Sequence, residues 1–406
     1  MMKEQEERIK YKNLITPCYV IHNDILQDGI DLLKTSLDKY WNNYIVGYSF
    51  KTNSLPYVIG VMRNAGFHAE VVSEDEYLLA CKYGFRNIIY NGPVKGRETF
   101  QDAILSGQIV NIDSKREVEW LKEIDRDDVS VGIRVNFDIE SLCPGETSAG
   151  DEGSRFGFSV ESGELACVID ELVSNGINIT GLHLHVGTKT RSVKVYRELA
   201  RAACRLKRDY KLNLRYIDVG GGYFGGMENK PKFPDYVKAI AEELQEEFTP
   251  DGLTLIMEPG TSLITPPIDY ITTVVDTKRT YANNLVTVDG SRIDVDALHR
   301  KTSYFSSIEY KEPTDNREIL DKQVICGFTC MEDDRLFTVN NEAELRPGDR
   351  IRLSKVGGYT MCLTPLFIRY FPAVYLEQNS EYSVIREAWG VEEYSRKCTP
   401  YEGEID

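Results

Sequence analysis

Residues 178–223, NITGLHLHVGTKTRSVKVYRELARAACRLKRDYKLNLRYIDVGGGY, decide the fold class of this chain. The stretch begins and ends with short apolar runs that are typical of strands, at 178–186 and 214–219. Between these runs, residues 190–209 carry apolar side chains at the spacing of a helix that packs on one face. A strand, a helix and a second strand in this order predict two strands that pair in parallel.

The same alternation extends over residues 44–258. Six further strand-like runs, separated by helical stretches, are YIVGYSF (44–50), HAEVV (68–72), NIIYN (87–91), QIVNID (108–113), VSVGIRVN (129–136) and LTLIME (253–258). With the first two runs they make eight, which predicts an α/β fold of the (β/α)8 TIM-barrel type. An open, doubly wound sheet is the alternative α/β arrangement.

After residue 262 the pattern changes. Runs such as IDYITTVVDTKRTY (268–281) and DRIRLSKV (349–356) follow one another without long helices between them, which predicts a second, mostly antiparallel β domain. The short strand TPCYVI (16–21) is expected to join that sheet. The expected domains are an N-terminal segment that contributes to the β domain, the barrel and the C-terminal β domain, at residues 1–30, 31–262 and 263–406.

Composition narrows the class of protein. A net charge of −16 argues against nucleic acid or an anionic membrane as the main partner. No apolar run approaches the roughly 18 residues of a membrane helix, and the charged residues 1–13 do not resemble a secretory signal. The nine cysteines are scattered without a CxxC pair, so a zinc ribbon is not expected. We therefore expect a cytoplasmic protein.

Chemically versatile residues lie where the predicted barrel strands end, and barrel enzymes place their active sites at the C-terminal strand ends. These residues are Lys51, Arg134, His183, His185, Gly220, Gly221, Gly222 and Glu258. A lysine at such an end, beside apolar neighbours, loses hydration, which lowers its pKa and suits an amine that attacks an aldehyde. The alternative for Lys51 is a solvated surface lysine.

The other strand-end residues also allow two interpretations each. The three glycines at 220–222 suit a phosphate near a helix start, although a plain turn has the same pattern. His183 and His185 face the same side of a strand, which suits a metal site or a stacking imidazole; the other three histidines lie at no barrel strand end, so no metal is expected. Glu258 is either a buried structural carboxylate or the partner of a pyridine nitrogen.

Taken in order, these segments resemble the alanine-racemase-fold decarboxylases, the family of diaminopimelate and ornithine decarboxylases. The resemblance covers roughly residues 14–377 and is carried by YSFKTN (48–53), IRVN (133–136), SRFGF (154–158), GLHLHVGT (181–188), DVGGGY (218–223), EPG (258–260), CMEDDRLF (330–337) and GGYT (357–360). It implies decarboxylation of an amino acid with pyridoxal 5'-phosphate carried on Lys51. An amino-acid racemase of the same fold and a non-catalytic homologue that binds a partner protein are the alternatives.

The resemblance also implies roles for single residues. It places His185 on the pyridine ring, Glu258 at the ring nitrogen, and the remaining cofactor contacts at Arg134, Thr188, Gly220, Gly221, Gly222, Gly260 and Tyr359. It implies a homodimer with shared active sites, in which Cys330 enters the site of the partner subunit. Cys330 or Lys51 is then the donor of the proton that replaces the carboxylate.

Two departures from the family pattern concern the substrate. Thr261 stands where the family usually has an arginine after EPG, and Met331 stands where it usually has an acidic residue after the loop cysteine. Neither can pair with a charge at the far end of a substrate, so a modified or conjugated amino acid is expected. Asp334, four residues after Cys330, is the carboxylate expected to face the substrate in its place.

Overall fold

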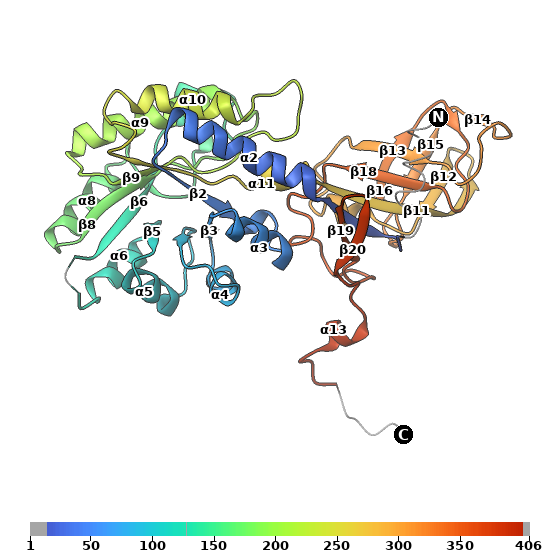
Figure 1. The fold of residues 1–406 in the computed structure, drawn as a ribbon, viewed down its shortest axis with the longest axis horizontal. Coiled ribbons are helices and arrows are strands. Elements are labelled where there is room, and N and C mark those ends of the chain that lie inside the picture. Colours follow the sequence, from blue (N-terminus) through green and yellow to red (C-terminus); the bar gives the residue numbers. More distant parts are fainter. Residues whose placement is uncertain (1–13, 127, 401–406) are drawn as a thin grey trace. The chain divides into compact units, whose positions relative to one another are not determined.

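A computed structural model describes residues 14–126 and 128–400, and the chain forms two compact units (Figure 1). One unit is Gln27–Thr265, and the other combines the segment up to Leu26 with the chain from Pro266 onward. These divisions lie a few residues from the expected boundaries after residues 30 and 262. Residues 1–13 of the expected N-terminal segment lie outside the described residues.

The first unit is a closed barrel of eight parallel strands, which confirms the predicted (β/α)8 fold. The strands are β2 (Tyr44–Ser49), β3 (His68–Val71), β4 (Ile88–Tyr90), β5 (Ile109–Ile112), β6 (Ser130–Asn136), β8 (Asn178–His183), β9 (Tyr216–Asp218) and β10 (Thr254–Met257). Each pairs with its neighbours in parallel; β10 pairs with β2 and β5 pairs with β6, so the sheet has no free edge. The two-residue strand β7 (Phe158–Ser159) adds to β6 outside this circle.

Helices occupy the connections between the strands. They are α2 (Asn23–Tyr40), α3 (Pro56–Asn64), α4 (Glu74–Lys82), α5 (Arg97–Leu105), α6 (Lys115–Lys122), α8 (Glu164–Ser174), α9 (Val193–Tyr210) and α10 (Phe233–Leu244), with short turns η1 (Phe50–Thr52), α7 (Ile139–Leu142), η2 (Gly150–Glu152) and α11 (Thr261–Ile264).

Helix α9 shows why these segments become helices. The Ser192 side chain accepts a hydrogen bond from the Lys194 N–H and caps the first turn. Apolar residues spaced three or four apart, among them Val195 and Leu199, are buried. On its polar side, Arg197 pairs with Glu243 of the neighbouring helix α10 at 2.8 Å (Figure 1). The helix therefore lies flat on the barrel with its charges on the outside.

The second unit is a mostly antiparallel sheet with the strand order β16-β15-β12-β11-β1-β19-β20, in which β18 pairs with β11 and β13. The bounds are β1 (Cys18–His22), β11 (Ile268–Arg279), β12 (Asn284–Val288), β13 (Phe305–Glu309), β15 (Gln323–Cys326), β16 (Arg335–Val339), β18 (Arg350–Ser354), β19 (Ala373–Gln378) and β20 (Glu381–Arg386), with the small pair β14 (Ile319–Leu320) and β17 (Glu342–Ala343) and the short helices α12 (Arg292–Val295) and α13 (Val391–Ser395).

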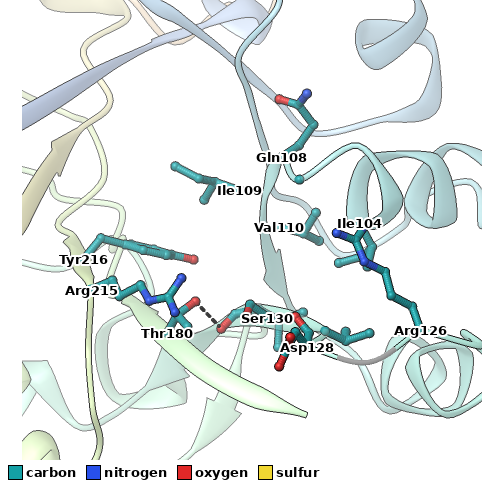
Figure 2. A pocket seen from close by; sticks show the side chains of 13 residues that line it. Ile104, Gln108, Ile109, Val110, Arg126, Asp128, Ser130, Thr180, Arg215 and Tyr216 are labelled. Atoms are coloured by element: carbon teal, nitrogen blue, oxygen red, sulfur yellow. Dashed lines mark hydrogen bonds between the residues drawn. The ribbon is translucent and has the colours of Figure 1, made fainter.

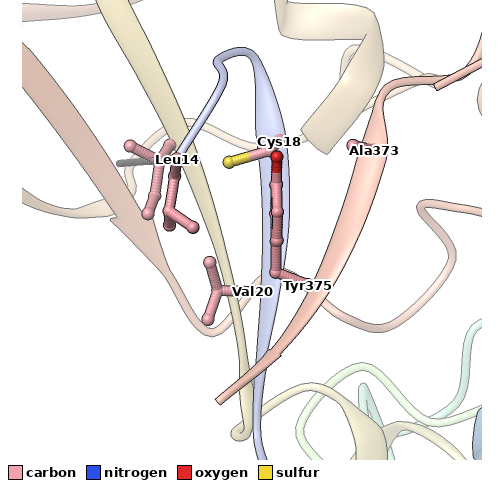
Figure 3. Packing of buried hydrophobic residues seen from close by; sticks show 6 residues of the cluster. Leu14, Cys18, Val20, Ala373 and Tyr375 are labelled. Atoms are coloured by element: carbon pink, nitrogen blue, oxygen red, sulfur yellow. The ribbon is translucent and has the colours of Figure 1, made fainter. Parts of the chain in front are cut away.

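The N-terminal strand joins this sheet, as predicted. Strand β1 lies between β11, which it meets antiparallel, and β19, which it meets in parallel. Cys18 and Val20 on β1 pack with Ile271, Ala373 and Tyr375 in a buried apolar cluster (Figure 3). Burial raises the pKa of the Cys18 thiol to about 12, so this cysteine acts as a small apolar residue. No described helix is long and apolar enough to cross a membrane.

Candidate active site

Lys51 lies just past the C-terminal end of β2, in the short turn η1. Its Nζ donates to Oε2 of Glu70 at 2.6 Å, and the Glu70 carboxylate on β3 is buried. The lysine side chain itself is about one third exposed, at 34%. A buried carboxylate thus holds an accessible ammonium group at the end of the barrel where such enzymes act.

A second carboxylate is linked to the first by one amide. Asn91, just after β4, donates through Nδ2 to Oε1 of Glu258 at 2.6 Å and to Oε1 of Glu70 at 3.1 Å. The predicted site residue Glu258 is therefore only one side chain away from the partner of Lys51. Neither Glu70 nor Asn91 was identified from the sequence, although a carboxylate inside the apolar run 68–72 was a usable signal.

The surroundings of Glu258 set its charge. Its Oε2 lies 3.5 Å from Nε2 of His183, and both side chains are buried. Burial alone would raise the pKa of Glu258, but the nearby His183 and Lys51 outweigh it and hold this pKa well below its usual range. Burial, and then the charge of Glu258, raise the pKa of Asp218 well above its usual range. Glu258 is therefore ionised while Asp218 keeps its proton.

His183, Asp218 and Glu258 each place one ligand atom within 4.8 Å of the others, which is also the spacing of a metal site. Because Asp218 keeps its proton beside the ionised Glu258, the cluster does not offer the two deprotonated carboxylates that a metal ion would need there. Asp218 is also used by the chain itself, since its Oδ1 accepts the N–H of Gly220 at 2.9 Å. We therefore interpret His183 and Asp218 as residues that set the surroundings of Glu258.

His185 has the geometry of a neutral stacking ring. It is partly buried and lies roughly parallel to the ring of His183, with the ring centres 6.2 Å apart. Its Nδ1 faces the N–H of Gly221 at 3.1 Å, so Nδ1 accepts and the ring proton is on Nε2. Burial, followed by the charges of Arg134 and Lys51, lowers the pKa of His185 to about 3. The imidazole is thus uncharged at neutral pH.

The loop after β9 can be built only from glycine. Gly220 and Gly222 have φ angles of 67° and 95°, in the left-handed region. A Cβ at Gly221 would lie 2.2 Å from the carbonyl oxygen of Glu258. Thr188 follows β8, the strand that ends at His183. Its hydroxyl is buried and has no hydrogen-bond partner among the described residues. A bare loop and an unsatisfied hydroxyl fit a phosphate group.

The two other predicted barrel residues lie at the same strand ends. Arg134 on β6 is buried and donates to Oδ2 of Asp113 at 2.9 Å, while its guanidinium stacks over Phe156. Gly260 begins α11, and a Cβ there would lie 2.4 Å from Cγ2 of Thr52, the residue after Lys51. The segments that follow β2 and β10 therefore touch at the site.

The remaining predicted residues lie in the β unit. Cys330 is exposed in the loop between β15 and β16, and Met331 beside it is partly buried. Tyr359 is 43% exposed and has a φ angle of 58°. The exposed side chains of Cys330 and Tyr359 are accessible to another molecule.

Asp334 requires a correction. Its side chain is buried, and its oxygens accept hydrogen bonds from the Ser291 hydroxyl, the Arg292 N–H, and the N–H and hydroxyl of Thr329. These donors use the carboxylate fully, which argues against the expected contact with a substrate. Asp334 instead fixes the loop that carries Cys330.

A cavity of about 310 Å³ lies elsewhere on the barrel, at the N-terminal ends of its strands (Figure 2). Ile109, Ser130 and Thr180 line it, and Tyr216 closes it toward the barrel interior. None of the predicted site residues lines this cavity. The candidate active site is therefore at the opposite ends of the same strands.

The pyridoxal-binding domain of the pyridoxal-dependent decarboxylases matches residues 29–265 of this chain. The chain belongs to this family. It is 28% identical over 373 residues to a probable chloroplastic diaminopimelate decarboxylase of Oryza sativa subsp. japonica, covering 87% of this chain and 74% of that protein. It is 27% identical over 328 residues to the diaminopimelate decarboxylase of Helicobacter pylori strain J99, covering 78% and 79%.

Solved structures share the fold. The diaminopimelate decarboxylase of M. jannaschii in complex with L-lysine superposes with a TM-score of 0.85 at 20% identity, covering 97% of this chain and 94% of that one. The arginine decarboxylase of Paramecium bursaria Chlorella virus superposes with a TM-score of 0.75 at 19% identity, covering 93% and 100%.

These comparisons confirm the family, the fold class, the cofactor and the activity expected from the sequence. The protein is a pyridoxal-phosphate-dependent amino-acid decarboxylase, a carboxy-lyase. The racemase and the non-catalytic homologue, which were the alternatives, are not favoured by any of these relatives.

Proposed function

We propose that pyridoxal phosphate is carried on Lys51 at the C-terminal ends of the barrel strands, with its ring nitrogen toward Glu258. When bound, the cofactor supplies an electron-accepting ring that stabilises the charge left by the departing carboxylate. The connected set of Lys51, Glu70, Asn91 and Glu258 carries this proposal. Its hydrogen bonds link the accessible amine to the ionised carboxylate through two buried side chains.

The other residues divide the remaining work. An ionised Glu258 holds a proton on the ring nitrogen by charge pairing, and the neutral ring of His185 stacks on the pyridine face. The phosphate is held by the loop of Gly220, Gly221 and Gly222, by the Thr188 hydroxyl and, as further proposed contacts, by Gly260 and Tyr359. Arg134, oriented by Asp113, is proposed as the cation beside the ring.

Peptide mapping tests the place of the cofactor. The purified protein, reduced with borohydride and digested, should carry the reduced cofactor on the peptide that contains Lys51. Lys51→Ala should lose this covalent label. Lys95 is unsuitable for the control variant because it is buried in an ion pair with Glu117. The exposed Lys115→Met is the matched control and should keep the label. A label on another lysine of the parent would contradict the proposal.

We further propose that the enzyme works as a cytoplasmic homodimer with shared sites. The partner subunit's Cys330 then donates the proton that replaces the carboxylate at Cα, a role supported by its exposed loop position. The nine cysteines, all of them in the described part of the chain, form no disulfide, which supports a reducing compartment such as the cytoplasm.

The substrate is proposed to be an amino acid whose side chain is neutral, masked or conjugated. The curated relatives are named as diaminopimelate decarboxylases, but Met331 and Thr261 cannot pair with a distal charge. The saturated carboxylate of Asp334 strengthens this argument, because it is not available to replace them. Burying an unpaired distal charge costs several kcal/mol, about a hundredfold or more in binding.

Competitive kinetics on free and acylated diamino acids test this proposal. We expect CO2 release from acylated or conjugated forms with a kcat/KM at least about a hundredfold above that for free ornithine, lysine or diaminopimelate. Met331→Glu should narrow the difference by restoring a carboxylate to the loop. Efficient turnover of free diaminopimelate by the parent enzyme would show that its distal charge has a partner that this proposal lacks.

A further inference from the structure

A chain of buried side-chain hydrogen bonds crosses the barrel interior and ends at the two carboxylates of the site. The Tyr216 hydroxyl donates to Oδ1 of Asn111 at 2.7 Å, and Nδ2 of Asn111 donates to Oδ1 of Asn91 at 2.9 Å. Nδ2 of Asn91 then donates to both Glu258 and Glu70. All five side chains are buried.

The carboxylates at one end of this hydrogen-bonded series fix which group donates and which accepts at every step. A carboxylate only accepts, so the Asn91 amide must turn its NH2 group toward Glu258 and Glu70. Its oxygen then needs a donor, which Asn111 supplies, and the oxygen of Asn111 in turn takes the hydroxyl of Tyr216. A flipped Asn91 would place its oxygen against two carboxylates and leave buried acceptors unsatisfied. Asn111 and Tyr216, inside the barrel, thus determine the orientation of the Asn91 amide.

Space for this chain is built into two neighbouring strands. A Cβ at Gly132 on β6 would lie 2.1 Å from the hydroxyl of Tyr216 and 2.1 Å from Oδ1 of Asn111. A Cβ at Gly181 on β8 would lie 2.0 Å from the phenol ring. Tyr216 also packs in one buried cluster with Ile89 of β4 and Ile256 of β10. The phenol therefore has one place to lie.

We propose that Asn91 is a positioning residue, whose amide holds Glu258 at the ring nitrogen and Glu70 at Lys51 in a fixed relation to each other. Asn111 and Tyr216 act through Asn91 by fixing its orientation. This inference rests on the proposed place of the cofactor. It goes beyond that proposal because it assigns a role to three residues that touch neither the reacting atoms nor the substrate.

The decisive variant is Asn91→Asp, which keeps the shape of the side chain and replaces its donor by a further carboxylate. That carboxylate would face Glu70 and Glu258. The other ionisable groups around the site include Lys51, Lys95, Arg134, His183, His185 and Asp218. We expect the Kd of the apoenzyme for pyridoxal phosphate, from absorbance titration, to rise about a hundredfold near pH 8. Part of the loss should be recovered near pH 6, where the crowded carboxyls can take up a proton.

Tyr216→Phe is the second variant, since it removes one hydroxyl and keeps the ring. The Kd should rise by about 2- to 10-fold, the effect of one net hydrogen bond. In the Asn91→Asp background the same change should have a smaller effect, because the orientation that it supports is already lost. A purely structural role for Asn91 would predict neither the recovery near pH 6 nor this coupling.

The matched control is Asn42→Asp. Asn42 also donates through Nδ2 to a carboxylate, that of Asp251, but on the exposed surface. Its Kd should stay within about twofold of the parent. If folded Asn91→Asp binds the cofactor as the parent does at both pH values, the inference is overturned; if Asn91→Asp does not fold, an unchanged Kd in Tyr216→Phe overturns it. Borohydride mapping of the parent decides separately whether the cofactor lies on Lys51.

Discussion

Glu258 and Asp218 are carboxyl groups at the ends of adjacent strands, yet their surroundings give them opposite protonation states. His183 and Lys51 lower the pKa of Glu258 despite its burial, whereas burial and the charge of Glu258 raise the pKa of Asp218. Only the ionised group can pair with a protonated ring nitrogen. The neutral Asp218 adds no second negative charge beside Glu258.

The sequence identifies the residues that lie in glycine-rich or charged motifs, and it misses those that are defined by a partner. Lys51 and Glu258 stand at predicted strand ends, where their position alone suggested chemistry. Asn91 also ends a strand, but an asparagine there is equally typical of a turn. Its function depends on Asn111 and Tyr216, which are far away in sequence and meet it only inside the closed barrel.

Two partly buried histidines make the stability of the apoenzyme depend on pH. Burial lowers the pKa of His68 to about 4, and burial with nearby positive charges lowers that of His185 to about 3. In the unfolded chain both have the ordinary value of 6.5. Between these values the unfolded state binds more protons, so the free energy of unfolding falls as the pH falls below about 6.5.

Urea unfolding of the apoenzyme at several pH values measures this effect. Each proton taken up on unfolding contributes a slope of up to about 1.4 kcal/mol per pH unit. His68→Gln should reduce the slope between about pH 6 and pH 5 by close to the contribution of one proton, about 1.4 kcal/mol per pH unit. Above about pH 7.5 the difference between parent and variant should be constant, since both imidazoles are then neutral in either state. Equal slopes at low pH would contradict the burial of His68 as its cause.

At the scale of elements, periodicity predicts the eight barrel strands and the long helices, because their apolar side chains face the core. It does not predict β7, α7 or η2, which all lie between residues 137 and 160. Helix α7 is one turn long and is held by the Asp138 side chain, which accepts the Ser141 N–H. So short a helix cannot repay the cost of its own nucleation, and only tertiary contacts decide whether it forms.

The fit of Tyr216 between strands can be tested by adding one methyl group. Gly181→Ala on β8 would place its Cβ against the phenol, so we expect the free energy of unfolding to fall by about 1–3 kcal/mol. In combination with Tyr216→Leu the cost should be clearly smaller than the sum of the two single changes.

The control for this change is Gly60→Ala. Gly60 lies in helix α3, and nothing is within 4 Å of the place its Cβ would take. Alanine there should be neutral or should stabilise by up to about 1 kcal/mol. If Gly181→Ala is tolerated as well as Gly60→Ala, the space around Tyr216 is not reserved for its ring.

At the scale of the whole molecule, the two architectures follow from the change of pattern near residue 262, because local periodicity reports which face of each element is buried. The proposed contact between subunits leaves no such pattern, since it would involve only a few exposed residues on a loop. Cys330 is the residue proposed to make this contact, and hydrogen bonds to the buried Asp334 hold its loop. A hydrogen-bonded loop with an exposed thiol is suited to the proposed entry into a site on another subunit.

Complementation between two inactive chains tests whether sites are shared. Lys51→Ala removes the residue proposed to carry the cofactor, and Cys330→Ala should lower turnover by roughly 10²- to 10⁴-fold if it is the proton donor, as proposed. If each site takes Lys51 from one chain and Cys330 from the other, every mixed dimer contains one intact site. Random exchange of equal amounts makes half of the dimers mixed, so about a quarter of the parental activity should return.

The result depends on subunit exchange, which a size tag on one chain makes visible as a dimer of intermediate mass. Each variant alone, exchanged with itself, sets the baseline. Cys362→Ala, another exposed cysteine of the β unit, replaces Cys330→Ala in the matched control. If the turnover of Cys362→Ala is close to that of the parent enzyme, the donor role is specific to Cys330. Mixed dimers that form without any return of activity would show that Lys51 and Cys330 do not meet across the interface.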